Sequence, residues 1–223
     1  MFYPSIRQLF ESRANREEAS WMKKYMRNQF EFLGIKTPVR RALMRELLLN
    51  RTLANLSAGE LKPLVMELWE APAREYQYLA MELLDRKIKK ADPGILELLE
   101  YMIVVRSWWD TVDMIAGHLV GKLLLLHPEL VPRWVNKWME SGNIWLQRTA
   151  ILYQLSYKGK TDERILFDNI RNLASSKEFF IQKAIGWALR EYAKTNPEAV
   201  IQFVSENQLA PLSRREALRR LEL

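Results

Sequence analysis

A regular recurrence of alanine inside helical apolar patterns is the feature that most constrains how this chain folds. The gaps between the alanines are 38, 36, 34, 34 and 33 residues, at positions Ala42, Ala80, Ala116, Ala150, Ala184 and Ala217. Small residues at fixed places allow neighbouring helices to approach closely. A period of this size with two helices per unit is typical of repeat proteins, in which each unit packs against the next.

Two segments show the repeat most directly. Residues 143–155 align without gaps with residues 177–189, and their aromatic positions, their Ala-Ile pair and their final leucine all match. Apolar residues elsewhere recur at three- and four-residue steps, and no run alternates with period two. The sequence therefore predicts an all-α fold, an α-solenoid of HEAT-like helical pairs with a concave basic groove. A non-repetitive helical bundle is the alternative, because alanine is common in helices.

Length and composition agree with one helical domain. The 223 residues are 48% hydrophobic, which is enough for one sizeable core or one continuous repeat array. The 9 prolines and 8 glycines are few for an all-β protein with many turns, and the absence of cysteine excludes disulfides and thiolate metal sites. We expect a single domain over residues 1–223, with a helical N-terminal segment to about residue 50 and repeats over about 51–223.

Capping patterns mark the expected starts of several helices. A serine followed by glutamate three residues later is typical of a capping box, and it occurs at Ser57–Glu60, Ser175–Glu178 and Ser213–Glu216. Ser107 is expected to cap the next helix, and Thr37 stands before a first-turn proline.

Positive charge gathers near these helix starts. The net charge is +7, and residues 21–45 hold seven basic residues against one acidic residue. A cation near a helix start costs about 0.3–1 kcal/mol, unless an anion sits there to meet it and the free backbone N–H groups. The residues concerned are Arg40, Arg41, Lys177, Arg214 and Arg215. They predict a row of phosphate sites matched to a nucleic-acid backbone, and a solvated basic surface is the alternative.

An indole and a carboxylate share one predicted helical face, because Trp109 and Asp113 lie four residues apart. Trp108 and Trp109 are about 100° apart on a helix, so we expect one to pack and the other to be available. Two further groupings could face the same groove, namely Trp145 with Gln147 and Arg148, and Trp187 with Arg190. Most tryptophans are expected in the core, including Trp69, Trp134 and Trp138.

A lone carboxylate flanked by indoles suits a cationic ligand or transition state. Indole faces attract cations by about 0.5–2 kcal/mol, and a carboxylate can stabilise positive charge and orient or deprotonate a water. A purine alkylated at N3 or N7 is cationic and can leave as a neutral base without a general acid. The two histidines lack the spacing of a zinc helix, and no phosphate-binding loop or serine-nucleophile motif is present.

Five stretches resemble the bacterial AlkD family of HEAT-like repeat alkylpurine DNA glycosylases. They are residues 25–41, 107–113, 143–148, 176–194 and 209–217, and the resemblance covers nearly the whole chain. It implies an enzyme that cups duplex DNA and hydrolyses the N-glycosidic bond of N3- and N7-alkylated purines, of the 3-methyladenine and 7-methylguanine type. It also implies base excision repair without flipping of the damaged base, unlike glycosylases in general.

The resemblance assigns roles to individual residues of this sequence. Asp113, Trp109 and Trp187 correspond to catalytic residues that contact the deoxyribose of the lesion. Arg148 corresponds to an arginine that holds DNA phosphate near the lesion, and Tyr25 to a tyrosine that approaches the DNA. With the basic helix starts, the expected DNA-binding set is Arg148, Arg190, Tyr25, Lys36, Thr37, Arg40, Arg41, Lys177, Gln182, Lys183, Arg214 and Arg215.

The expected partner is double-stranded DNA containing alkylated purines, bound by a monomer without metal or other cofactor. No signal peptide or membrane-spanning apolar run is visible, which favours a cytoplasmic protein associated with the nucleoid through DNA. One alternative is a non-catalytic HEAT-repeat protein that binds branched or distorted DNA. A protein-binding adaptor is another, and the basic helix starts count against it.

Overall fold

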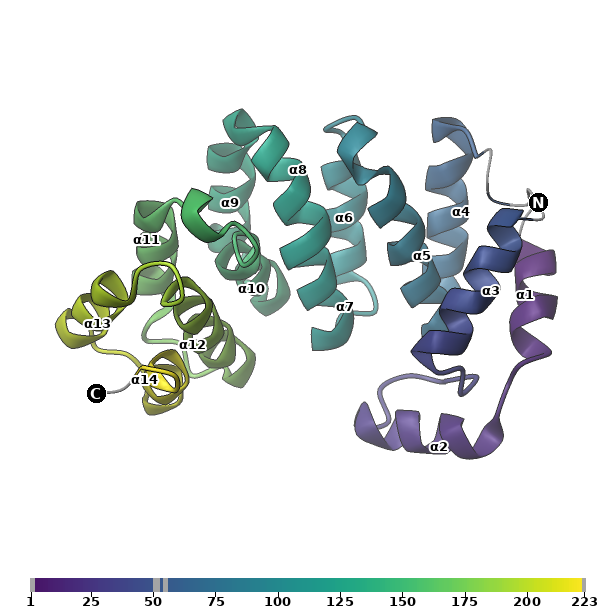
Figure 1. The fold of residues 1–223 in the computed structure, drawn as a ribbon, viewed down its shortest axis with the longest axis horizontal. Helices are drawn as coiled ribbons and strands as arrows, with labels where there is room; N and C mark the ends of the chain where they lie inside the picture. Colours follow the sequence, from purple (N-terminus) through teal and green to yellow (C-terminus); the bar gives the residue numbers. More distant parts are fainter. Residues whose placement is uncertain (1–2, 50–52, 54–55, 222–223) are drawn as a thin grey trace. The chain divides into compact units, whose positions relative to one another are not determined.

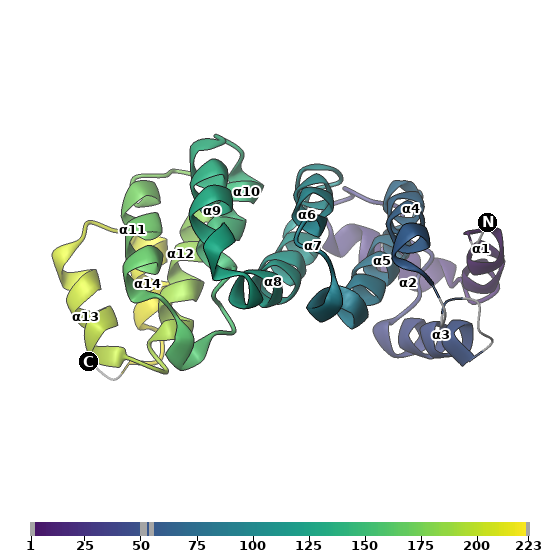
Figure 2. The ribbon, with the colours of Figure 1, turned by 90° about the horizontal axis from the view of Figure 1, so that it is seen from above.

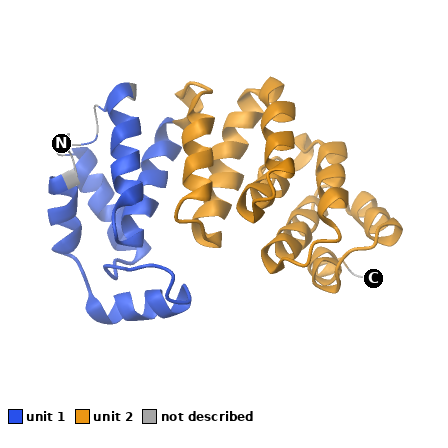
Figure 3. Cartoon of the chain, turned by 180° about the vertical axis from the view of Figure 1, so that it is seen from behind, with its two compact units in different colours: residues 1–87 blue, residues 88–223 orange. Residues whose placement is uncertain are grey.

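The computed structural model describes residues 3–49, 53 and 56–221, and these residues form helices and connecting loops without a β-strand. An isolated bridge joins Glu31 and Ala73. The chain divides into two compact units, residues 1–87 and residues 88–223, coloured separately in Figure 3. The boundary between the two units lies at Lys87. The all-α class is confirmed.

Unit 1 contains the first five helices. They are α1 (Tyr3–Glu11), α2 (Arg16–Tyr25), α3 (Thr37–Leu49), α4 (Ala58–Glu70) and α5 (Arg74–Lys87). The α4 and α5 helices pack together, and α1 and α3 join them through contacts of α1 with α3 and α4, and of α3 with α5. Trp69, Leu68 and Leu79 are fully buried in this core. By contrast α2 has no buried residue and lies crosswise to α1 and α3 (Figure 1).

Unit 2 begins with the short helix η1 (Ile88–Lys90) and the helix α6 (Ile95–Val104), which are followed by one long helix made of the consecutive sections α7 (Trp109–Met114), η2 (Ile115–Val120) and α8 (Gly121–Leu126). After it come η3 (Pro128–Leu130) and α9 (Val131–Glu140). The middle section, η2, is a π-helix between α7 and α8. π-Helical turns are rare in proteins, and those that occur are often found at functional sites. Trp134 and Trp138 are buried on α9, as the sequence predicted.

The second half of unit 2 stacks helices in chain order. Its elements are α10 (Ile144–Leu152), η4 (Lys158–Lys160), α11 (Glu163–Leu173), α12 (Phe179–Tyr192), α13 (Pro197–Glu206) and α14 (Pro211–Leu218). Helix α10 contacts α7, α9, α11 and α12, and α12 contacts α13 and α14, as Figure 2 allows the reader to follow. Helix α12 therefore packs between α10 and α14, each of which is two helices away from it in the chain.

Five of the six repeated alanines are buried. They stand at positions 80, 116, 150, 184 and 217, as the repeat pattern predicted, whereas Ala42 is exposed on α3. Gly186 likewise allows close packing between α12 and α14. A Cβ placed on Gly186 would lie 2.5 Å from the Cβ of Glu216 and 2.9 Å from the carbonyl oxygen of Ser213. The two helices can approach this closely because that position has no side chain.

The capping predictions have mixed outcomes. The box at Ser57 is confirmed, since the Ser57 hydroxyl lies 2.6 Å and its backbone N–H 3.0 Å from Oε2 of Glu60. The prediction at Ser107 is wrong by one residue. Trp108 is the N-cap of α7, and its backbone carbonyl accepts the N–H of Val112 at 3.0 Å.

The predicted boxes at Ser175 and Ser213 are both wrong. Helix α12 begins at Phe179 with Glu178 as its N-cap, and α14 begins at Pro211. Ser213 therefore lies inside α14, where its hydroxyl donates to the carbonyl of Gln182 on α12 at 3.0 Å. The Ser213 hydroxyl therefore forms a hydrogen bond between two helices, instead of capping a helix as the local pattern predicted.

No individual helix in the described part of the chain combines the length and apolar character needed to cross a membrane. By length and composition alone, the stretch 109–126 passes only together with 128–140, as a pair bent by 108°.

Candidate functional site

A buried ion pair joins Asp113 of α7 to Arg148 of α10. Nε of Arg148 donates to Oδ1 of Asp113 at 2.7 Å, and Nη2 donates to Oδ2 at 2.9 Å. Nη1 of the same guanidinium donates to the backbone carbonyl of Phe180 on α12. Arg148 is only 4% exposed. One buried side chain therefore ties together the three helices α7, α10 and α12, and each of its nitrogens already has an acceptor.

The pairing determines the charge state of the carboxylate. Burial raises the pKa of Asp113, and the hydrogen bonds and positive charge of Arg148 oppose that increase. A bidentate guanidinium favours the ionised form of the carboxylate that it holds. Arg148 occupies one lone pair on each oxygen, and each oxygen keeps a second. The Asp113 side chain is 17% exposed, so part of it can be reached by a small reactant such as water.

Trp109 is the first residue of α7, one turn before Asp113, so both side chains lie on one face as predicted. Trp187 lies on α12, two turns and about 10 Å along the helix from Phe180. It is partly buried against the core of unit 2. The Arg148 contacts thus link the two helices that carry all three predicted catalytic residues.

Trp108 packs, as expected for one of the two adjacent tryptophans. Its ring centroid lies 5.9 Å from that of Trp145 and 5.3 Å from that of Phe180, and these two rings are 4.8 Å apart. Trp145 therefore belongs to an aromatic cluster, whereas the sequence analysis allowed it to face a groove. The cluster includes Phe180, whose carbonyl accepts a hydrogen bond from Arg148. It supports the ion pair through packing, and sequence spacing alone could not reveal it.

Two predicted DNA-binding residues of α12 share an acidic partner that the sequence analysis missed. Arg190 donates to Oε2 of Glu216, and the Lys183 ammonium lies 3.2 Å from its Oε1. Burial acts to raise the pKa of Glu216, but the hydrogen bonds from the two cations outweigh it and the pKa is lowered. The neighbouring Gln182 donates to the carbonyl of Ser176 at 3.0 Å.

Unit 1 holds one predicted DNA contact in its interior. Arg40 is 8% exposed, its Nη2 lies 2.9 Å from Oε1 of Glu82, and its guanidinium lies 4.8 Å from the ring centroid of Tyr78. Arg40 is therefore buried and paired within unit 1, which does not favour the phosphate contact expected of it. Lys36 pairs with Glu18 at 2.6 Å.

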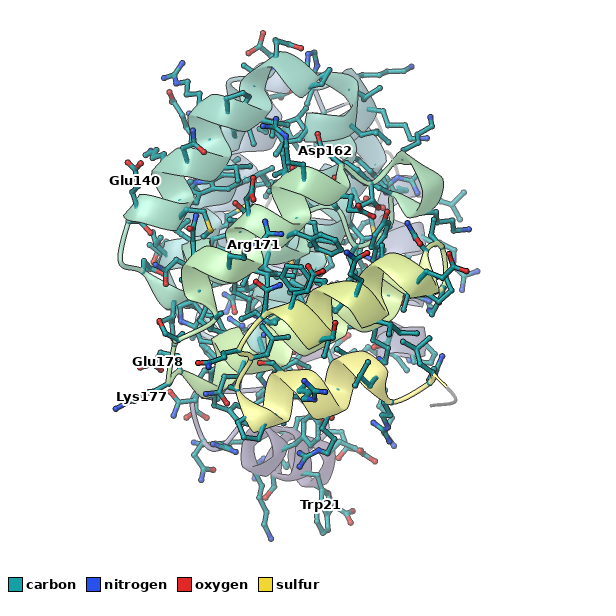
Figure 4. All side chains as sticks on the ribbon, turned by 90° about the vertical axis from the view of Figure 1, so that its left-hand side faces the viewer. Trp21, Glu140, Asp162, Arg171, Lys177 and Glu178 are labelled. Carbon is teal, nitrogen blue, oxygen red and sulfur yellow. The ribbon has the colours of Figure 1, made fainter. Side chains whose placement is uncertain are left out.

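The other basic candidates are exposed, but their positions relative to the helix starts differ from those on which the predicted row of phosphate sites rested. Lys177 comes before the N-cap of α12 and projects from the ribbon in Figure 4. The backbone N–H groups of Arg40 and Arg214 already donate at 3.0 Å to the carbonyls of Lys36 and Ala210, and the Arg214 side chain donates to the carbonyl of Val204. Thr37, Arg41, Arg215 and Tyr25 are also exposed.

The comparisons with known proteins agree with a role in DNA repair. The model of the family described as DNA alkylation repair enzyme matches residues 6–221. A solved structure described as a predicted DNA alkylation repair enzyme from Enterococcus faecalis is 34% identical, with a TM-score of 0.87 over 93% of this chain and 96% of that chain. A comparison with curated proteins finds no match. Because the family model spans nearly the whole chain, this protein belongs to the family of DNA alkylation repair enzymes.

Proposed function

We propose that this protein is a DNA glycosylase that excises N3- and N7-alkylated purines from duplex DNA, without flipping the base and without a cofactor. The observation that carries the proposal is the Asp113 carboxylate, which is held by the buried Arg148 one helical turn after Trp109. The family supports alkylated DNA as the substrate. The stacking of α10, α12 and α14 supports a HEAT-like solenoid, and we propose that it binds DNA as a monomer.

The reaction uses the charge of the lesion itself. When the N-glycosidic bond breaks, its electron pair goes to the cationic purine, which leaves as a neutral base. The deoxyribose becomes an oxocarbenium-like cation, and water adds to its C1′ and gives its proton to the Asp113 carboxylate, which returns it to solvent. Asp113 stabilises that cation and accepts a hydrogen bond from the water. The indole faces of Trp109 and Trp187 add cation–π attraction.

In this proposal Arg148 orients Asp113, in place of the phosphate contact that the family resemblance implies. Its nitrogens donate to Asp113 and Phe180. We assign phosphate binding instead to exposed basic and polar residues, to the half-buried Gln182, and to Lys183 and Arg190, whose charge Glu216 partly neutralises. These residues are Tyr25, Lys36, Thr37, Arg41, Lys177, Gln182, Lys183, Arg190, Arg214 and Arg215.

The test is release of 7-methylguanine and 3-methyladenine from methylated duplex DNA by the purified protein. Replacing Asp113 with Asn keeps the shape and removes the charge, so we expect excision to fall about a hundredfold or more. Asp110→Asn, on the same helix, is the matched control and should retain activity. Equal release by the wild type and by Asp113→Asn, or no release by either, would refute the proposal.

A further inference from the structure

Helix α2 presents two large aromatic side chains to solvent. Trp21 is 63% exposed and Tyr25 is 71% exposed, and they lie one turn apart on the same face. No residue of α2 is buried, and Trp21 projects away from the ribbon in Figure 4. Because neighbouring exposed aromatics leave apolar area in water, such a pair marks an interaction site more often than a solitary exposed side chain does.

Hydrogen bonds and ion pairs hold α2 in place, so the exposure is not that of a frayed end. The Asn15 side chain accepts the backbone N–H groups of Glu17 and Glu18 at 3.1 Å, and the backbone N–H of Asn15 donates to the Leu33 carbonyl at 2.8 Å. Glu18 also pairs with Lys36. The start of the helix is therefore anchored to the segment that leads into α3.

That segment is in turn fixed by Glu75 of α5, which is fully buried. Its carboxylate accepts the backbone N–H groups of Leu33, Gly34 and Ile35 at 3.0, 2.8 and 3.0 Å. Gly34 has φ +82°, and a Cβ there would lie 2.0 Å from the Asn15 carbonyl oxygen. The aromatic pair thus stands on a preorganised support, which reduces the ordering cost of binding.

The charge around the pair indicates the kind of partner. The Lys24 ammonium lies 5.8 Å from the Trp21 ring centroid. Arg27, just after the helix, is exposed and has no ion pair among the described residues. Aromatic rings interleaved with cations match a strand of nucleic acid, which offers flat bases for stacking and phosphates for the cations.

We propose that Trp21 and Tyr25, flanked by Lys24 and Arg27, form a stacking platform that binds an unpaired base of DNA. In a fully paired duplex both faces of each base are covered by its neighbours, so the platform favours DNA in which a base has left the stack. The inference rests on DNA as the ligand of the proposed function, but it does not depend on excision of a base.

The experiment measures binding to a duplex with one bulged 2-aminopurine and to the same duplex fully paired. We expect Trp21→Ala to weaken binding to the bulged duplex about tenfold or more and to leave the paired duplex nearly unchanged. The wild type should quench the 2-aminopurine fluorescence by stacking, and Trp21→Ala should not. Trp21→Phe should keep most of both effects. Leu126→Ala, which removes a 52% exposed side chain of unit 2, is the matched control.

Three results would overturn the platform. One is equal affinity of the wild type and Trp21→Ala for the bulged duplex, and another is an equal loss on bulged and paired DNA. The third is a Trp21-dependent affinity for phosphatidylserine vesicles with no effect on DNA, which would identify α2 as a membrane-surface helix. Neither DNA is alkylated, so a failure here is distinguishable from a failure of the excision assay.

Discussion

At the scale of single residues, the pair of Asp113 and Arg148 is the contact on which the candidate site most depends. Their side chains are 17% and 5% exposed, so neither charge is well solvated if the other is removed. A buried ion pair adds little net stability over an apolar pair, but breaking it leaves an uncompensated charge. Structure and activity are therefore coupled at this position.

We expect Arg148→Met to lower the free energy of unfolding by about 3–5 kcal/mol, because Asp113 is left buried and unpaired. The double variant Asp113→Asn with Arg148→Met should recover part of that loss. Urea denaturation followed by tryptophan fluorescence measures both. Lys194→Met, which breaks an exposed pair with Glu191, should change stability by less than about 1 kcal/mol. Equal stability of Arg148→Met and the wild type would contradict this account.

At the scale of elements, the contact of α12 with α14 combines close packing with charge. Gly186 allows the approach, Ser213 bonds to the Gln182 carbonyl, and Glu216 holds Lys183 and Arg190. Two of the cations proposed to contact DNA, Lys183 and Arg190, are therefore oriented by an acid on α14. The same acid makes this helix contact sensitive to pH.

Stability should fall in acid through Glu216. Its pKa is lower in the folded protein than the ordinary value of 4.5, so the unfolded chain binds more protons between the two values. The contribution of Glu216 is therefore complete above about pH 4.5 and is lost as the pH falls through the folded-state pKa. Glu216→Gln should be less stable at pH 7 and lose less on acidification.

Urea unfolding of both proteins across that pH range measures the effect. Glu140→Gln, an exposed glutamate at the end of α9, is the control and should follow the wild type. If Glu216→Gln and the wild type lost the same free energy on acidification, Glu216 would not be the group responsible.

At the scale of the whole molecule, a net charge of +7 is carried by exposed basic side chains in both units. Association with a polyanion releases counterions, so affinity depends steeply on salt. Residues that contact phosphate contribute to that dependence without choosing the lesion. Salt titration therefore separates them from residues that act in excision.

Lys177→Ala should weaken binding to methylated and unmethylated duplexes alike. The slope of log Kd against log salt concentration should flatten by about 0.9, the amount expected for one lost phosphate contact. Fluorescence anisotropy at several salt concentrations measures the slope. Lys89→Ala removes an exposed lysine outside the proposed set and should leave the slope unchanged. An unchanged slope for Lys177→Ala would remove this residue from the interface.

Features that depend on nearby residues could be predicted from the sequence. The helical class, the burial of Trp69, Trp134 and Trp138, and the shared face of Trp109 and Asp113 all follow from the 3.6-residue period. The Ser57 box was also predictable, because both its members lie within one turn. The box predicted at Ser213 does not form, because the Ser213 hydroxyl donates to a backbone carbonyl of another helix.

Partners distant in the sequence were decided by the tertiary structure alone. Arg148 meets Asp113 across 35 residues, Arg40 meets Glu82 across 42, and Glu75 reaches the Leu33–Ile35 backbone across 40 to 42. The sequence by itself determined which helices form and which faces are apolar. Which arginine is a solvated cation and which is a buried partner depends on the burial and acceptors that helix packing creates, and these have no local signal.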